Sequence, residues 1–430
     1  MAHLQNLNLH SSRFKLEHGV CLGLIANLAA FAYYLYSLSD VGYLPAPFMP
    51  NKFDNFMDLF NPLYWAFNDR RYTDWASVYP PLVFWFLRAI ANLFNLTVIG
   101  EPNEPVYIRE HSGLLIHCLI ALYFLIPLVV LNSQLWKKIS RKGKVIFYCL
   151  LVLSPPMLFS LDRGNLIVFA PLFISLLLAA SGFRQLVLIG ILINIKPYFA
   201  ILLLVYIIGA RWRELWAAIL VSGIIFMTSG ILLDESFMSM IGNIINFNGA
   251  VADVSVPDIV NFPSSISAFS FVLRVFEFRF LGELALFLGL IIDAAKYILI
   301  CYTIYSMYAN RHGCSEQELF ACAIILIANS GTSVGGYSLI LYYAIVPVLL
   351  CSASGRVMLT LMLTLYFPLD LVPLTSHVTG EQRLFFTDET ATVTWNLGLG
   401  ALIRPVVNFG ILFIAIQFLN SRRSEALAIR

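Results

Sequence analysis

Long runs of apolar residues, separated by short polar segments, recur along almost the whole chain. A helix needs about 20 mostly apolar residues to cross the hydrocarbon core of a membrane. The runs in this sequence predict about twelve crossings, counted by length and by the positions of basic residues. The predicted spans cover residues 18–38, 112–131, 145–161, 166–181, 185–209 as two short passes, 215–233, 283–307, 319–331, 337–353, 357–373 and 398–419.

Basic residues orient these spans, because Lys and Arg collect in the cytoplasmic segments of membrane proteins. An apolar stretch at residues 78–96 is long enough to be counted as a span. Counting it would place the basic turn after the next span outside the cell, which contradicts that tendency; this turn contains Lys137, Lys138, Arg141, Lys142 and Lys144. Residues 39–111 are therefore predicted to form one long outer loop, in which residues 78–96 make an in-plane interfacial helix.

The segment 185–209 contains Lys196-Pro197 at its middle. Proline cannot continue the hydrogen bonding of a helix, so two short passes hinged there are predicted. This arrangement places Lys196 near the outer face and keeps Arg211 and Arg213 inside. More than half of the 27 basic residues then lie in cytoplasmic segments, together with both termini, whereas most of the 25 acids lie outside.

Composition agrees with a membrane protein: 59% of the residues are hydrophobic and only 12% are charged. The formal net charge of +2 gives no indication of a nucleic-acid partner. Cysteines form no CxxC or Cys/His cluster and are read as small buried hydrophobic residues. The predicted fold class is an all-α polytopic membrane protein, with residues 1–430 forming a single membrane domain.

Two acids in the first outer loop are candidates for chemistry. Asp54 and Asp58 are four residues apart and share a face if the segment is helical. A carboxylate among apolar residues at a membrane surface can act as a general base, because desolvation raises its pKa. Either acid can instead cap a helix or remain solvated, and the spacing does not choose between them.

Aromatic residues surround these acids. They either stack on sugar rings or form an interfacial belt that anchors the loop in the lipid headgroups. The aromatic residues of this loop include Phe53, Phe56, Phe60, Tyr64, Trp65, Phe67, Tyr72, Trp75 and Tyr79.

A polar turn, Asp162-Arg163-Gly164-Asn165, joins two spans with almost no loop between them. An unpartnered Asp and Arg at the edge of the bilayer are costly, so the turn is predicted to cap helices, to belong to a site, or both. Few cations lie near the outer face. Lys196 and Arg404 are the most costly to place in lipid, which makes them candidates for binding a phosphate, although Arg404 can also snorkel to headgroups.

The order of these motifs resembles the GT-C superfamily of glycosyltransferases that use polyprenyl-phosphate sugars. It is most similar to the bacterial mannosyltransferase branch and also to enzymes that glucosylate O-antigen. The resemblance covers about residues 50–200, whereas residues 215–430 match only as a variable set of helices. The motifs that carry it are the acidic outer loop, Tyr79-Pro80-Pro81-Leu82, Asp162-Arg163-Gly164-Asn165 and Asn194-Ile195-Lys196-Pro197-Tyr198.

The resemblance implies an inverting transfer of one sugar at the periplasmic face of a bacterial inner membrane. The family's acid normally begins a short Asp-Phe run, whereas here Asp54 precedes Asn55-Phe56. Distance to the aromatic motifs makes Asp54 the better match for the base, with Asp58 in reserve and Asp162 as a supporting acid. Lys196, Arg404 and Arg163 are implied to bind the donor phosphate, and the residues implied to bind sugar or acceptor are Tyr72, Trp75, Tyr79, Asn165 and Tyr198.

The implied partners are a polyprenyl-phosphate sugar donor, a glycan or glycolipid acceptor and membrane lipid. No cofactor is required, because a lipid phosphate paired with cations is already a good leaving group. A divalent cation fits only if Asp54, Asp58 and Asp162 converge. A transporter or flippase for a lipid-linked sugar, and an O-antigen ligase or polymerase, are the alternative functions; the sequence names neither the sugar, the acceptor nor the oligomeric state.

Overall fold

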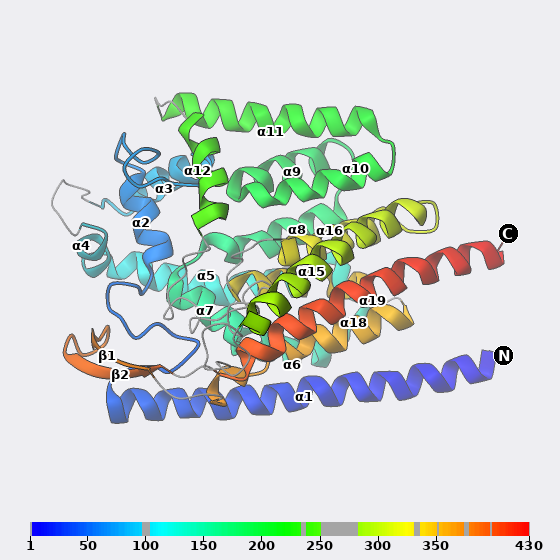
Figure 1. Ribbon diagram of the computed structural model, residues 1–430, viewed down its shortest axis with the longest axis horizontal. Helices are drawn as coiled ribbons and strands as arrows, with labels where there is room; N and C mark the ends of the chain where they lie inside the picture. Colours follow the sequence, from blue (N-terminus) through cyan, green and yellow to red (C-terminus); the bar gives the residue numbers. More distant parts are fainter. Residues whose placement is uncertain are drawn as a thin grey trace.

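The computed structural model describes residues 2–96, 104–233, 238–250, 283–330, 336–350, 352–373, 378–395 and 398–429. Long helices lie side by side in a bundle, and both termini lie at the same end of it (Figure 1). Shorter helices and a hairpin occupy the opposite end. The bundle helices are α1 (Ala2–Val41), α5 (Gly113–Leu131), α6 (Arg141–Val152), α7 (Pro155–Arg163), α8 (Ala170–Ala179), α9 (Phe183–Ile195), α10 (Leu204–Ile208), α11 (Trp212–Leu232), α15 (Glu283–Ala309), α16 (Glu316–Ser330), α17 (Leu341–Leu349), α18 (Ala353–Thr364) and α19 (Gly400–Ile429). Helix α12 (Met238–Ala250) runs across α9 and α11 (Figure 1).

Within the described residues, four helical segments are long and apolar enough to cross a membrane. These segments are Gly19–Val41, Gly113–Leu131, Trp212–Leu232 and Gly400–Arg422. The α6–α7 pair adds a fifth if it is one span, bent by 52° where two prolines begin α7. The chain is therefore a helical membrane protein, as the composition predicts, and a helix or pair of consecutive helices lies in each stretch predicted as a span.

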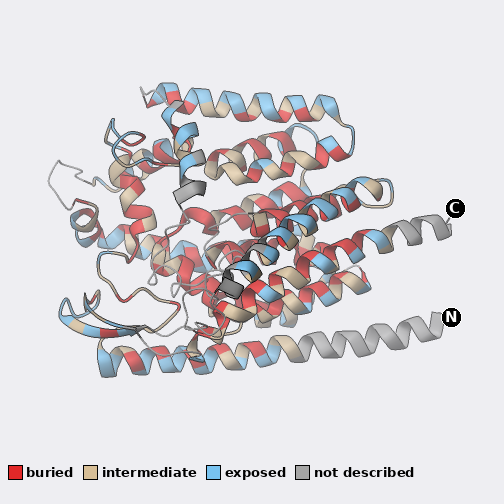
Figure 2. Ribbon diagram, in the orientation of Figure 1, coloured by how far each residue is buried: buried red, intermediate tan, exposed pale blue. Residues whose placement is uncertain are grey.

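Central helices are buried and outer helices expose apolar side chains, as expected for a bundle surrounded by lipid. Helices α16 and α17 are buried on nearly all sides at the centre of the bundle, whereas outer helices expose large apolar side chains (Figure 2). On α11, for example, Leu220 is 63% exposed and Ile231 is 72% exposed. Such faces are costly in water and favourable against acyl chains.

The helix break predicted at Lys196-Pro197 is confirmed. Helix α9 ends at Ile195, Lys196 is extended, and a 3-10 helix, η3 (Pro197–Leu203), follows and leads into α10. The buried Asn194 amide donates to the Gly190 carbonyl at 2.8 Å and to the Ser222 carbonyl of α11 at 3.1 Å, so the end of α9 is fixed against its neighbour.

The predicted span at residues 357–373 is wrong in its second half. Helix α18 ends at Thr364, and Pro368 and Pro373 prevent its continuation by removing backbone donors. Between them lies a single 3-10 turn, η7 (Leu369–Leu371).

The all-α prediction omitted an antiparallel hairpin of β1 (Val378–Arg383) and β2 (Thr390–Trp395). Thr alternates with apolar residues along β2, a pattern that favours a strand, and Val393 is buried on one face while Thr392 and Thr394 are exposed on the other. A bridge between Pro373 and Gly398 closes the base of the hairpin.

The first loop packs around a hydrophobic cluster separate from the main core, to which residues of α5, α12 and the end of α11 also contribute. It contains α2 (Met57–Trp65), α3 (Pro81–Leu93) and α4 (Glu104–Glu110), and α3 confirms a helix within residues 78–96. Pro81 occupies the first turn of α3, where a missing backbone donor costs nothing. The loop is thus a packed unit that can hold side chains in place.

Charged residues join this loop to the hairpin. The Lys52 ammonium lies 2.7 Å from an Asp388 carboxylate oxygen and 2.6 Å from Glu110, and Arg383 donates to both oxygens of Asp388. The Lys52 amide also donates to the Arg383 carbonyl at 2.7 Å. The hairpin therefore clamps the chain two residues before Asp54.

This clamp is expected to weaken in acid. Hydrogen bonds from Lys52 and Arg383 lower the pKa of Asp388 below its usual 3.8, so the stabilisation is complete above pH 5 and is lost as the pH falls through that lowered pKa. Hydrogen exchange at residues 378–395, corrected for intrinsic rates, should be slow at pH 7 and fast near pH 2. Asp388→Asn should exchange fast already at pH 7, and equal protection in the two proteins at pH 7 would contradict the clamp.

Candidate active site

The polar turn after α7 supports the site through its backbone. Gly164 ends α7 in the left-handed region, with φ of 64°, and a side chain there would lie 3.3 Å from the Phe56 backbone. Asn165 caps the following 3-10 helix, η2 (Leu166–Phe169), by accepting from the Ile167 amide at 2.9 Å. The cap that the sequence predicted is present, and glycine allows residues 54–58 to approach closely.

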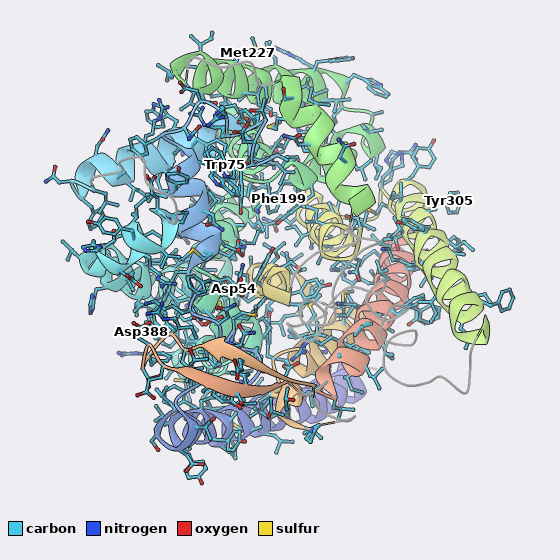
Figure 3. All side chains as sticks on the ribbon, turned by 60° about the vertical axis from the view of Figure 1, so that its left-hand side comes forward. Asp54, Trp75, Phe199, Met227, Tyr305 and Asp388 are labelled. Atoms are coloured by element: carbon cyan, nitrogen blue, oxygen red, sulfur yellow. The ribbon has the colours of Figure 1, made fainter. Side chains whose placement is uncertain are left out.

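Arg163 brings the two candidate acids together. Its guanidinium donates to the Asp54 carbonyl at 3.0 Å and to the Asp54 carboxylate at 3.3 Å, and it donates to the Asp58 carboxylate at 2.9 Å. The motif in the first loop and the motif after α7 thus form one ionic cluster. Asp54 lies between the hairpin and α2 (Figure 3).

The two carboxylates differ in how fully they are bound. Asp58 is 20% exposed, and its second oxygen accepts from the Asn165 amide at 2.7 Å. Asp54 is 38% exposed, and in the described part of the chain its Oδ2 accepts no hydrogen bond. Asp58 is therefore committed to the cluster, whereas Asp54 has an oxygen free to accept a proton.

Asp162 points away from Arg163 and holds the loop instead. One of its oxygens accepts from the Asn55 amide at 2.7 Å, and the other accepts from the Met49 backbone at 3.0 Å. Its own carbonyl accepts from the Phe56 amide at 2.7 Å. The carboxyl is buried and lines a small cavity together with Asn55, so it positions the segment on either side of Asp54.

Lys196 lies on the other side of the cluster. Its ammonium lies 4.0 Å from the centre of the Tyr79 ring, a cation–π contact. Burial raises the pKa of the Tyr79 hydroxyl well above its usual value; Asp58 adds to the rise and Arg163 opposes it. Tyr337, which stacks on Phe159 of α7, lies within electrostatic reach of Lys196 and Asp58.

Tyr198, two residues after Lys196, also belongs to this group, since it lies near Tyr79 and Tyr337. The structure therefore places acids, an arginine, a lysine and three tyrosines around one region at the end of the bundle opposite the termini. Such a set offers a base, cations for an anion, and aromatic faces for a sugar.

Of the predicted binding residues, Arg163 and Asn165 are engaged by the two acids of the cluster. Three more predicted site residues have structural contacts. Tyr72 is buried and donates to the Tyr79 carbonyl at 3.1 Å, which gives it a structural contact in the core of the loop. Trp75 stacks on Trp65 with ring centres 6.3 Å apart, and it lies apart from Asp54 in Figure 3. Arg404 is fully buried in a two-pronged ion pair with Asp370.

A divalent cation has no prepared site among the described residues, where no group of three His, Cys, Asp or Glu side chains converges. Asp54 and Asp58 share a guanidinium, and Asp162 faces Asn55. The three carboxylates thus accept hydrogen bonds from Arg163 and Asn55 and do not converge on one point.

Sequence reasoning missed Asn55, Asp370 and Tyr337. Asn55 and Asp370 act through partners more than 30 positions away, Asp162 and Arg404, so no local pattern marks them. Tyr337 follows a Gly-Gly pair and begins a predicted span, and this pair was the signal in the sequence that could have marked it.

Comparison of the chain with protein-family models, with curated proteins and with solved structures found no match.

Proposed function

We propose that this protein is an integral-membrane inverting glycosyltransferase that moves one sugar from a polyprenyl-phosphate donor to a glycan or glycolipid acceptor. The observation that carries the proposal is the cluster in which Arg163 holds Asp54 and Asp58 beside Lys196 and Tyr79. It combines a carboxylate with a free oxygen, a cation without a described carboxylate partner, and aromatic rings, as the motif resemblance also implies.

In the proposed reaction, Asp54 removes the proton from an acceptor hydroxyl. The acceptor oxygen forms a bond to the anomeric carbon as the bond from that carbon to the phosphate oxygen breaks. The bonding pair leaves with the lipid phosphate, and Lys196 stabilises the charge that develops there. Attack opposite the leaving group inverts the anomeric centre.

The proposal includes the membrane arrangement that the basic residues predict. The chain crosses a bacterial inner membrane about twelve times, with its termini in the cytoplasm and the cluster at the periplasmic face. The shorter apolar helices, such as Phe183–Ile195, make the additional crossings. Their placement in one bundle with both termini at one end supports this arrangement.

The test is transfer by the purified protein in nanodiscs, with a panel of polyprenyl-phosphate hexoses and a membrane glycolipid extract. A single added sugar with inverted configuration is expected. Movement of the labelled donor across proteoliposomes without a covalent product would select a transporter, and transfer of a whole oligosaccharide would select a ligase or polymerase.

Lys196 tests the phosphate side of the site. Lys196→Gln should lower kcat/KM for the donor about 100-fold, because it removes the cation that faces the leaving phosphate. Lys196→Arg should retain most of the activity. Lys142→Gln, at an exposed position of α6, is the control and should leave the rate unchanged; equal rates for Lys196→Gln and the control would remove Lys196 from this role.

A further inference from the structure

A cavity lies at the end of the bundle that carries the hairpin, between α1, the segment 44–50 and strand β2. Its wall consists mainly of aromatic side chains and prolines, and its polar groups include the Asp370 carboxylate and the Thr394 hydroxyl. The residues that define it are Tyr33, Tyr43, Phe48, Asp370 and Thr394, together with the three prolines of the segment 44–50.

This lining matches the chemistry of a sugar ring. Aromatic and pyrrolidine rings offer flat apolar faces, on which the C–H face of a sugar stacks. The Asp370 carboxylate is held by Arg404, yet a carboxylate has about four lone-pair positions and can accept further hydrogen bonds from hydroxyls. A few polar groups in an apolar cavity are the usual means of orienting a small ligand.

Charge excludes a phosphate in the same place. Among the described residues of the cavity wall, Asp370 is the one that carries a charge, and its partner Arg404 is fully buried. The Asp370 carboxylate would repel an anionic headgroup, whereas it can accept hydrogen bonds from the hydroxyls of a neutral saccharide. The cavity therefore favours a neutral sugar over a phospholipid headgroup.

The cavity also opens toward the lipid-facing side of the bundle. Tyr33 of α1 lines it and is 50% exposed, and Tyr36, one turn further along the same face, is 60% exposed. Helix α1 carries one of the apolar segments long enough to span a membrane. A lipid tail can lie against this face of α1 while its headgroup occupies the cavity.

A second, smaller cavity lies between this place and the segment that carries Asp54. It shares Tyr43 and Phe48 with the first cavity and reaches Asn55 and Asp162. Asn55 is the residue after Asp54, and Asp162 holds its side chain. A saccharide in the first cavity thus lies beside the segment that carries the candidate base.

We propose that this cavity binds the saccharide headgroup of a neutral glycolipid, which serves as the acceptor. The proposal rests on the proposed function for the acceptor role, but the binding itself does not depend on it. Donor and acceptor would then enter from different sides of the cluster: the donor phosphate at Lys196, and the acceptor through the cavity under the hairpin.

Binding is tested with one lipid that carries a sugar, monohexosyl-diacylglycerol, and with two that do not, diacylglycerol and the anionic phosphatidylglycerol. Native mass spectrometry of the protein released from nanodiscs should show about tenfold greater retention of the glycolipid than of either sugar-free lipid, equivalent to about 1.4 kcal/mol. Thr394→Trp, which fills the cavity, should abolish the difference. Thr392→Trp, an exposed threonine on the same strand outside the cavity wall, should keep it.

Equal retention of the three lipids, or glycolipid retention unchanged in Thr394→Trp, would overturn the proposal. A kinetic experiment separates this failure from failure of the proposed function. In the active protein, Thr394→Trp should raise KM for the glycolipid at least tenfold while donor hydrolysis by water is unchanged. Glycolipid binding without any conversion of a donor would retain the cavity site and reject the glycosyltransferase.

Discussion

Asp54→Asn is expected to lower the rate of sugar transfer by about 10³-fold, within the range of about 10²–10⁴ that a positioned general base contributes. The amide cannot take the proton from the acceptor hydroxyl. The substitution should leave the site otherwise intact, because Arg163 also donates to the Asp54 backbone carbonyl and keeps its bond to Asp58. The measurement is single-turnover transfer from the polyprenyl-phosphate hexose that the wild type uses.

Two controls make this result specific. Asp74→Asn removes an exposed carboxylate of the same loop, paired with Arg70 at 3.0 Å, and should leave the rate unchanged. Asp58→Asn should retain more activity than Asp54→Asn, because Asp58 holds Arg163 and Asn165 and is not the proton acceptor. Undiminished turnover in Asp54→Asn would remove that role, and loss in Asp58→Asn alone would transfer it to Asp58.

The length of the apolar runs predicted a helical membrane protein, because a helix needs about 20 mostly apolar residues to cross the membrane. The hinge at Lys196-Pro197 was readable because proline acts locally. The hairpin was not, because its strands are short and lie between apolar runs that dominate the pattern. The end of α18 was misplaced because apolar residues continue past Thr364, although the chain turns at Pro368.

The site was predictable to the extent that its residues belong to short motifs. Asp54, Asp58 and Asp162-Arg163-Gly164-Asn165 were found, but which acid faces Arg163 depends on how two distant segments pack. Asp162 turns toward Asn55 and Met49 while its neighbour Arg163 turns toward the two outer acids. No spacing rule encodes that division between adjacent residues.

The partner of Arg404 could not be predicted from the sequence either, because a cation near the outer face can bind either a ligand or a distant carboxylate. The structure pairs it with Asp370, and both side chains are buried. Glycine at position 400 permits this pair, since a side chain there would collide with the Arg404 guanidinium and the Asp370 carboxylate. The pair ties the start of α19 to the turn at Leu369–Leu371, and so fixes the base of the hairpin.

Arg404→Ala is therefore expected to destabilise the protein by about 3–5 kcal/mol, because it leaves the Asp370 charge buried without its partner. Replacing both residues, as Asp370→Leu with Arg404→Met, should recover most of that loss. Unfolding free energies measured by steric trapping in bicelles would resolve the difference. Arg211→Ala is the matched control: the Arg211–Glu316 pair is about one-third exposed, and its loss should cost about 1 kcal/mol or less.

The double variant also separates the two readings of Arg404. If Arg404 serves the fold, the double variant should keep its KM for the polyprenyl-phosphate donor, while its KM for a glycolipid acceptor rises because Asp370 has left the cavity wall. If Arg404 binds the donor phosphate, the same variant should be stable yet lose donor affinity about tenfold or more. An unchanged donor KM thus assigns this buried arginine to the fold, and a raised donor KM assigns it to the donor site.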